Sequence, residues 1–258
     1  MPMIEVECKD RIAWIYLNRP EKRNALCQEM VLMLSNEIKK QLSNNDCRLI
    51  VIGARGASFC SGADLESILQ LQTNSFEENL ADSQMLRSLF QLIFESSKPI
   101  VSMVQGAAFA GGCGLATITD FCFASTDAKF AYTEVKIGFI PALVMVFLKY
   151  KISGQHLRNL LFTGNVISAQ QAHEIGLVSH VVQDNNSLQI QVAEFAHQFI
   201  SQTSGNSFAL TKQLMLESNE LNLNEALDLA AKSNAHARST DDCKKGIHAF
   251  IHKLKVQW

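Results

Sequence analysis

The chain has 258 residues, of which 47% are hydrophobic and 19% charged, so it can bury the core of one large folded domain. Its formal net charge of −2 at pH 7 provides no general positive field of the kind that binds nucleic acid or anionic lipid. We therefore expect no nucleic-acid partner and no membrane partner, and any anionic ligand must be bound by local groups.

The seven cysteines are scattered singly, without a CxxC pair or the spacing of a zinc site. Reduced thiols in a cytoplasmic protein without a metal explain this usage most simply. The first residues do not resemble a signal peptide, and no uncharged stretch is long enough to span a membrane. We therefore expect a cytoplasmic protein.

The first half of the chain alternates strand-like and helix-like stretches. Residues 11–20, "RIAWIYLNRP", read as a strand that stops at a proline, and Val31, Leu34, Ile38 and Leu42 then recur at helical spacing. Buried strands are predicted at residues 47–56 and 98–106, separated by a helix-like stretch at about 76–96. This alternation predicts an α/β fold with parallel pairing.

The last part of the chain has a different pattern. Leu188, Val192, Phe195 and Phe199 lie at helical spacing, and three more helical patterns follow without a clear strand. We therefore divide the chain into an α/β core at residues 1–200 and a C-terminal helical module at 201–258. No long linker separates them, so the module is expected to pack on the core or on a neighbouring subunit.

Two glycine turns are the first candidates for chemistry. They lie in "FCSGADLESIL", residues 59–69, and "AFAGGCGLA", residues 108–116, each after an apolar strand and before a helical pattern. Glycine allows close approach of a ligand to the main chain. If the turns converge, two N–H groups can bind one oxygen as an oxyanion hole. The alternative is that both turns are only tight connections.

Five ordered blocks carry a resemblance that covers nearly the whole chain: "LNRPEKRNAL", "FCSGADL", "KPIVSMVQGAAFAGGCGLATITDFCFAS", "FAYTEVKIGFIP" and "FTGNVISAQQAHEIGLV". Together they resemble the enoyl-CoA hydratase/isomerase family, the crotonase superfamily. The resemblance implies a crotonase-like (ClpP/crotonase) α/β fold of repeated ββα units with a C-terminal helical module. It also implies a homotrimer or homohexamer, an acyl-CoA thioester as substrate, and no cofactor beyond the coenzyme A of that substrate.

By the same resemblance, the backbone N–H groups of Ala63 and Gly111 would hold the thioester oxygen as it becomes an enolate. Glu134, in "FAYTEVKIGF", matches the position of a catalytic glutamate and would act as general base and acid. Many hydratases of the family carry another glutamate three residues after the oxyanion glycine. This chain has Gly114 there, so a single carboxylate must do the chemistry.

The residues "TEVKIGFIPALV", with Gly114, look like the branch that contains methylglutaconyl-CoA hydratases of leucine breakdown. We therefore favour hydration of the 2,3-double bond of an enoyl-CoA, including a branched substrate of this type. The alternatives are an isomerase that converts 3-enoyl-CoA to 2-enoyl-CoA, other chemistry such as thioester hydrolysis or decarboxylation, and a non-catalytic acyl-CoA-binding protein.

Residues of three segments would bind the coenzyme A moiety, again by resemblance. The first group lies in "KRNAL" and its neighbour, the second in "GADL", and the third in the final helix, which in the family often comes from the adjoining subunit. The residues are Lys22, Arg23, Ala25 and Leu26; Ala63, Asp64 and Leu65; and Phe250 and Lys253.

Overall fold

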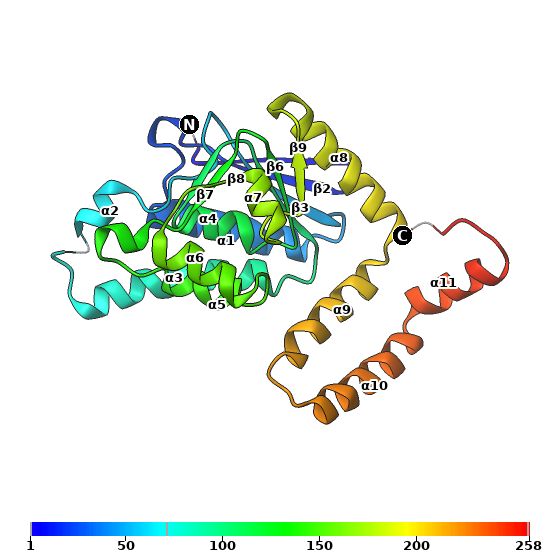
Figure 1. Cartoon of the computed structure of the whole chain (residues 1–258). Helices are drawn as coiled ribbons and strands as arrows, with labels where there is room; N and C mark the ends of the chain where they lie inside the picture. The colour runs from blue at the N-terminus through cyan, green and yellow to red at the C-terminus, as the bar shows by residue number, and fades with distance from the viewer. Residues whose placement is uncertain (1, 71, 257) are drawn as a thin grey trace.

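A sheet of six strands runs through the middle of the computed structural model, which describes residues 2–70, 72–256 and 258 (Figure 1). The side chain of Leu65 also lies outside the description. The strand order is β1-β2-β3-β4-β6-β9, and every neighbouring pair is parallel except the antiparallel β1 and β2. The strands are β1 Ile4–Lys9, β2 Ile12–Leu17, β3 Leu49–Ala54, β4 Ile100–Val104, β6 Phe121–Ser125 and β9 His180–Val182.

Three short strands form a second sheet in the order β5-β7-β8. They are β5 Ala107–Phe109, β7 Lys129–Ala131 and β8 Ile167–Ser168. β5 and β7 are parallel, and β7 and β8 are antiparallel. This small sheet positions the segment directly before helix α4, which begins at Gly111.

Helices connect and cover the strands. In the α/β part they are α1 Gln28–Ser43, α2 Leu65–Gln70, α3 Phe76–Phe94, α4 Gly111–Thr117, α5 Ala142–Leu148, α6 Gly154–Thr163, α7 Ala169–Glu174 and α8 Asn185–Gln202. Short 3₁₀ helices occur at η1 Pro20–Lys22 and η2 Glu134–Ile137. The remaining helices are α9 Gly205–Ser218, α10 Leu223–Ser239 and α11 Asp241–Ile251.

The sequence patterns explain why these elements form. The spacing of Val31, Leu34 and Ile38 places all three on the buried face of α1, as predicted. Helix α3 begins with a capping box, in which Ser75 Oγ accepts from Glu78 N and the Glu78 carboxylate accepts from Ser75 N. Strands β2 and β3 are apolar almost without interruption because the sheet is covered on both faces.

The core therefore has two parts, one on each face of the large sheet. The larger part packs α1, α3 and α4 against one face, with Leu34, Phe90 and Ile52 among its fully buried side chains. The smaller part packs α8 against the other face, where Leu188 and Val192 are buried. The predicted α/β class with parallel pairing is confirmed.

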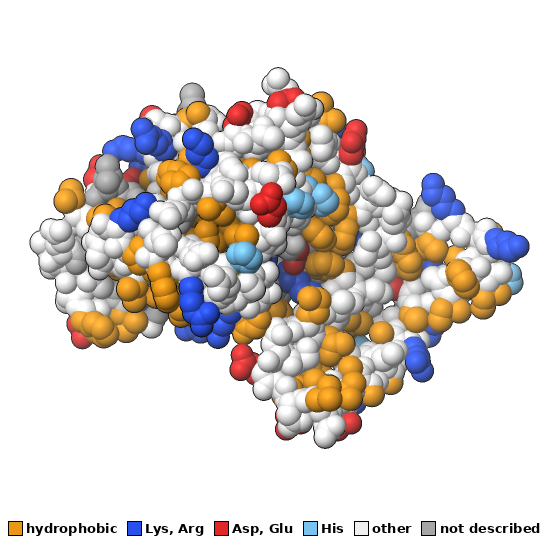
Figure 2. Space-filling model, in the orientation of Figure 1, with side chains coloured by type: hydrophobic (Ala, Val, Ile, Leu, Met, Phe, Trp, Pro, Cys, Tyr) orange, Lys and Arg blue, Asp and Glu red, His pale blue; other side chains and the backbone are white. Residues whose placement is uncertain are grey.

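Figure 1 shows α9, α10 and α11 projecting away from the sheet as an arm. An ion pair of 2.7 Å between Lys212 Nζ and Asp120 Oδ1 joins α9 to the core. Apolar side chains lie along the exposed surface of the arm, as Figure 2 shows, and they include Met215, Leu223 and Phe250. The division at residue 200 lies close to the end of α8 and stays a prediction. Within the described residues, no helix combines the length and apolarity that crossing a membrane requires.

Candidate active site

The two glycine turns lie side by side. The N–H groups of Phe59 and Cys60 both donate to Ala107 O, at 3.0 and 3.1 Å, and Phe109 N donates to Cys60 O at 2.9 Å. The segments approach so closely that a Cβ on Gly112 would lie 2.4 Å from Cys60 O. Glycine is therefore required at this position for the turns to meet.

In the first turn, the bonds made by Leu26 determine where the N–H of Ala63 points. Leu26 N donates to Gly62 O at 2.7 Å, and Leu26 O accepts from Asp64 N at 2.9 Å. Because a trans peptide points its N–H opposite to its C=O, the N–H of Ala63 faces away from Leu26. Among the described residues it has no hydrogen-bond acceptor.

The second turn leaves the N–H of Gly111 free in the same way. Ala110 O accepts from Gly114 N at 3.0 Å inside α4, so the N–H of Gly111 points away from that helix. Within the described part of the chain it too has no acceptor. A Cβ built on Gly62 would lie 3.7 Å from Gly111 N, so the two turns are in contact. Two unpartnered N–H groups therefore lie on adjacent turns.

Glu134 follows the strand that supports the second turn. Ala131, at the end of β7, accepts a hydrogen bond of 2.8 Å from Ala110 N, and η2 begins three residues later with Glu134. Burial raises the pKa of the Cys113 thiol on α4, and the charge of Glu134 adds to this effect. The hydrogen bond between Ala110 and Ala131 thus attaches the segment that carries Glu134 to the second turn.

The carboxyl group of Glu134 is buried, with the residue 9% exposed. Its Oε2 has no hydrogen-bond partner among the described residues. Burial raises the pKa of Glu134 above its ordinary value of 4.5, and a hydrogen bond from its own backbone N–H offsets only part of the effect. A buried carboxylate without a partner is costly for a fold, and such groups occur where a ligand completes the site.

Gly114 is enclosed by apolar side chains. A Cβ at this position would lie 2.4 Å from Val144 Cγ1 and 3.1 Å from Phe90 Cε2. Both neighbours are buried, Val144 on α5 and Phe90 on α3. A larger side chain at position 114 therefore requires that Val144 move.

The residues expected to bind coenzyme A fall into two places. Lys22 and Arg23 are exposed beside the first turn, and Arg23 O accepts from Ser61 N at 3.1 Å. Ala25 and Leu26 are buried next to Ala63. These residues are therefore grouped at the first turn, and their binding of coenzyme A stays a prediction.

Asp64 is also at this turn, but its carboxylate is already engaged. It pairs with Arg19 Nη2 at 2.9 Å and accepts from Glu66 N at 3.0 Å. Burial alone would raise the pKa of Asp64, yet these hydrogen bonds and the Arg19 charge hold it below its ordinary value. Only the main chain of Asp64 remains for a ligand. The expected contact of the Leu65 side chain lies outside the described residues.

Phe250 and Lys253 do not join this group within one chain. Phe250 is in α11 and Lys253 two residues beyond it, and Figure 1 shows α11 on the far side of the molecule from α2. Phe250 is 85% exposed. A role for these residues at the site therefore requires a second copy of the chain.

The family model described as "Enoyl-CoA hydratase/isomerase" matches residues 7–258. The chain belongs to the enoyl-CoA hydratase/isomerase family.

Relatives in this family match over almost their full length. A protein of Thermus thermophilus, provisionally named an enoyl-CoA hydratase, is 36% identical over 251 residues, which are 97% of this chain and 98% of that protein. The crotonyl-CoA hydratase of Syntrophomonas wolfei is 30% identical over 257 residues, covering 99% of this chain and 97% of the relative.

Solved structures of the family confirm the crotonase-like fold. Human enoyl coenzyme A hydratase domain-containing protein 3 is 29% identical, with a TM-score of 0.91 and complete coverage of both chains. The enoyl-CoA hydratase of Shewanella pealeana has a TM-score of 0.94 at 27% identity, covering 100% of this chain and 96% of that one.

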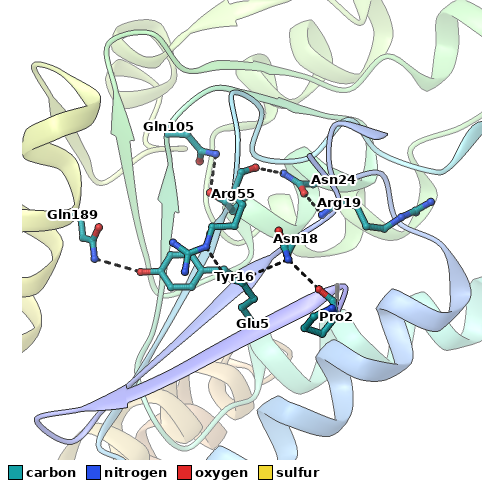
Figure 3. Close-up of polar contacts among 10 residues, drawn as sticks. Pro2, Glu5, Tyr16, Asn18, Arg19, Asn24, Arg55, Gln105 and Gln189 are labelled. Carbon is teal, nitrogen blue, oxygen red and sulfur yellow. Dashed lines mark hydrogen bonds and ion pairs between the residues drawn. The ribbon is translucent and has the colours of Figure 1, made fainter. Parts of the chain in front are cut away.

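Two side-chain amides that were not predicted from the sequence hold the turns, those of the buried Asn24 and the half-buried Gln105. Figure 3 shows Asn24 between the main chains of Arg19 and Arg55. Asn24 Nδ2 also donates to Ser58 O at 2.8 Å, and Gln105 Nε2 donates to the same oxygen at 3.2 Å. Gln105 lies two residues before β5, which leads into the second turn, so Ser58 O links the bases of both turns.

Arg55 secures the same segment from the outside. Its guanidinium lies 3.8 Å from the centroid of the Tyr16 ring and pairs with Glu5 at 2.8 Å (Figure 3). Gln189 Nε2 lies 3.4 Å from Tyr16 Oη and connects α8 to this group. Of these supporting residues, Arg19 and Asn24 lie in the block "LNRPEKRNAL", whereas Tyr16, Arg55, Gln105 and Gln189 lie outside the blocks or motifs used to predict the turns or are not distinguished within them.

Proposed function

We propose that this protein is an enoyl-CoA hydratase that adds water across the 2,3-double bond of an acyl-CoA thioester, with Glu134 as its single catalytic side chain. One observation carries the proposal. Among the described residues, Glu134 has a buried Oε2 without a partner and follows the strand that anchors the second turn, and each of the two adjacent turns leaves one N–H without an acceptor. These are the groups that water addition to an enoyl thioester needs.

In the proposed mechanism, the N–H groups of Ala63 and Gly111 bind the thioester oxygen. Glu134 removes a proton from water while the water oxygen bonds to C3, and the electron pair of the double bond moves toward the thioester as an enolate. Glu134 then returns a proton to C2. Loss of one such donor typically costs about 10² to 10³ in rate. No cofactor beyond the coenzyme A of the substrate takes part.

The proposal includes coenzyme A binding at the first turn, where Lys22 and Arg23 supply cations and Ala25, Leu26 and the main chain of Asp64 supply contacts. Phe250 and Lys253 of another subunit complete this binding site. The exposed apolar surface of the arm supports assembly into a trimer or hexamer, because patches of this kind occur at interfaces between subunits. The mass of the assembly in solution tests this part.

Purified protein with a 2-enoyl-CoA tests the activity. Hydration removes the conjugated double bond, so the ultraviolet absorbance of the enoyl thioester should fall. Glu134→Gln should bind the thioester and lose turnover. Glu174→Gln is a matched control, because Glu174 is exposed at the end of α7 and has no role in the proposed site. Full activity in Glu134→Gln would exclude the proposed role of Glu134.

The absence of a carboxylate at Gly114, which Val144 and Phe90 enclose, supports a second candidate, a 3-enoyl-CoA to 2-enoyl-CoA isomerase. Isomerisation needs one carboxylate, which takes a proton from C2 and delivers a proton to C4. The two reactions give opposite signals, since isomerisation of a 3-enoyl-CoA creates the conjugated absorbance that hydration consumes. Assays with both substrates distinguish them.

The acyl group and the remaining alternatives can be tested with the same protein. A panel that contains straight-chain, branched and methylglutaconyl-type enoyl-CoA thioesters defines the substrate, and release of free thiol or carbon dioxide would reveal thioester hydrolysis or decarboxylation. A non-catalytic acyl-CoA-binding protein would bind these thioesters without exchanging the C2 proton for deuterium in heavy water.

A further inference from the structure

Each of the two free N–H groups follows a residue with an unusual backbone conformation. Gly62, before Ala63, has φ +94°, and Ala110, before Gly111, has φ 49° and ψ −127°. Glycine adopts a positive φ without cost, but alanine does not, because its Cβ meets the neighbouring main chain. Ala110 is therefore held in a strained conformation beside the proposed active site.

Hydrogen bonds on both sides maintain this conformation. Ala110 N donates to Ala131 O at 2.8 Å, and Ala110 O accepts from Gly114 N at 3.0 Å. The residue before it is fixed as well, since Phe109 N donates to Cys60 O. The peptide between Ala110 and Gly111 cannot rotate without breaking the first hydrogen bond of α4.

The Ala110 methyl group lies in the contact between the turns. A Cβ built on Gly62 would lie 3.0 Å from Ala110 Cβ and 3.1 Å from Phe109 O. Gly62 thus packs its bare Cα against the Ala110 methyl, with no room for a side chain of its own. A glycine at position 110 would remove this contact and the strain together.

We propose that Ala110 is a positioning residue whose methyl group sets the separation of the Ala63 and Gly111 N–H donors. The strain is retained because a glycine would let the second turn relax toward Gly62. This inference rests on the proposed function, since it assigns both N–H groups to one thioester oxygen. It further attributes the separation of the two N–H groups to the Ala110 methyl group.

The test compares Ala110→Gly with the unchanged protein. A 3-ketoacyl-CoA serves as the probe, because its enolate carries negative charge on the thioester oxygen and absorbs in the ultraviolet. We expect Ala110→Gly to keep its fold and its affinity for a saturated acyl-CoA. The fraction of bound probe present as enolate should fall, with an apparent pKa about 1 unit higher, which is a tenfold change. With an enoyl-CoA, kcat should fall about tenfold while KM changes less than about twofold.

Two further variants separate positioning from a general effect of strain relief. Asp10→Gly relieves another positive φ of 51°, in the β1–β2 hairpin, and should leave the enolate fraction unchanged. Ala110→Ser retains the Cβ and should behave like the unchanged protein. Equal enolate fractions in the unchanged protein and in Ala110→Gly would overturn the proposal.

Failure of the proposed function can be distinguished from failure of the Ala110 proposal. If no enoyl-CoA is turned over but Ala110→Gly still shifts the enolate equilibrium, Ala110 positions the donors and the assigned reaction is wrong. If the unchanged protein does not favour the bound enolate at all, the two N–H groups do not act on one oxygen and the inference falls.

Discussion

Arg19 and Asp64 form an ion pair of 2.9 Å that connects the loop before α1 to the turn that carries Ala63. The two side chains are only 14% and 5% exposed. Arg19 also donates to Ala25 O at 3.0 Å, so one guanidinium bonds to both segments. The first turn is thus held by charge as well as by its backbone hydrogen bonds.

Arg19→Met should therefore destabilise the protein, because Asp64 would remain buried without its cation. We expect a loss of about 2 to 4 kcal/mol in the free energy of unfolding at pH 7, measured by urea denaturation. The activity should fall about tenfold as the Ala63 N–H loses its fixed position. Lys244→Met is the matched control, since the pair of Lys244 with Asp241 is on the surface and should contribute less than about 1 kcal/mol.

The pH dependence of this variant follows from the depressed pKa of Asp64. A carboxyl group with a lower pKa in the folded state stabilises the fold above its unfolded pKa, and this stabilisation is lost as the pH falls through the folded pKa. The difference between Arg19→Met and the unchanged protein should therefore be largest at neutral pH and shrink well below pH 3.8. A constant difference across this range would contradict the charge argument.

Glu134→Gln should have the opposite effect on stability. Because burial raises the pKa of Glu134 in the folded state, the charged form destabilises the fold at pH values above its unfolded pKa. The variant should thus show a higher Tm than the unchanged protein at pH 7, while turnover falls by about 10² or more. Below pH 4.5 the difference in Tm should disappear, since both side chains are then neutral.

The pH profile of activity gives an independent check on Glu134. A general base must be ionised, so the acidic limb of kcat/KM should lie above the ordinary glutamate value of 4.5. An acidic limb at or below that value would mean that Glu134 is more exposed to water during turnover than in the structure.

Much of the fold could be predicted because strong local patterns coincide with regular elements. The buried face of α1, the apolar strands β3 and β4 and the helical C-terminal region all follow from spacing and composition. The short strands β5, β7 and β8 could not be read in this way. They have two or three residues each and exist through their pairing with one another.

The candidate site was predictable only in part for a related reason. The glycine turns and Glu134 are visible as motifs, but the supports of the turns are contacts between distant segments. Asn24 bonds to Ser58 O, 34 residues away, and Val144 packs on Gly114 from another helix. Such contacts leave no periodic signal, because they depend on how the elements pack after they form.

Lys212 should be required for attachment of the arm. Its ammonium group meets Asp120, which also accepts from Ile100 N at 2.8 Å. Burial raises the pKa of Asp120 in spite of these partners, so removal of Lys212 leaves a carboxylate that is hard to keep charged. Lys212→Met should cost about 3 kcal/mol in unfolding free energy and expose the junction at 203–204 to proteases.

A double variant tests this explanation. Lys212→Met combined with Asp120→Asn removes both charges, so it should be less destabilised than Lys212→Met alone. Lys232→Met on α10 is a control for loss of a lysine on the arm. If the double variant is as unstable as the sum of its parts, the pair is not the reason that α9 holds to the core.

The packing of Val144 on Gly114 gives the last prediction. Gly114→Ala places a methyl group 2.4 Å from Val144 Cγ1, so it should destabilise the protein by about 1 to 3 kcal/mol although alanine favours helices. Val144→Ala removes Cγ1 and should cost about 1 to 2 kcal/mol through the cavity it leaves. In that background Gly114→Ala should become neutral or stabilising, because the added methyl fills the cavity. Urea denaturation of the four proteins measures the coupling, and additive effects would mean that Val144 does not determine which residue fits at position 114.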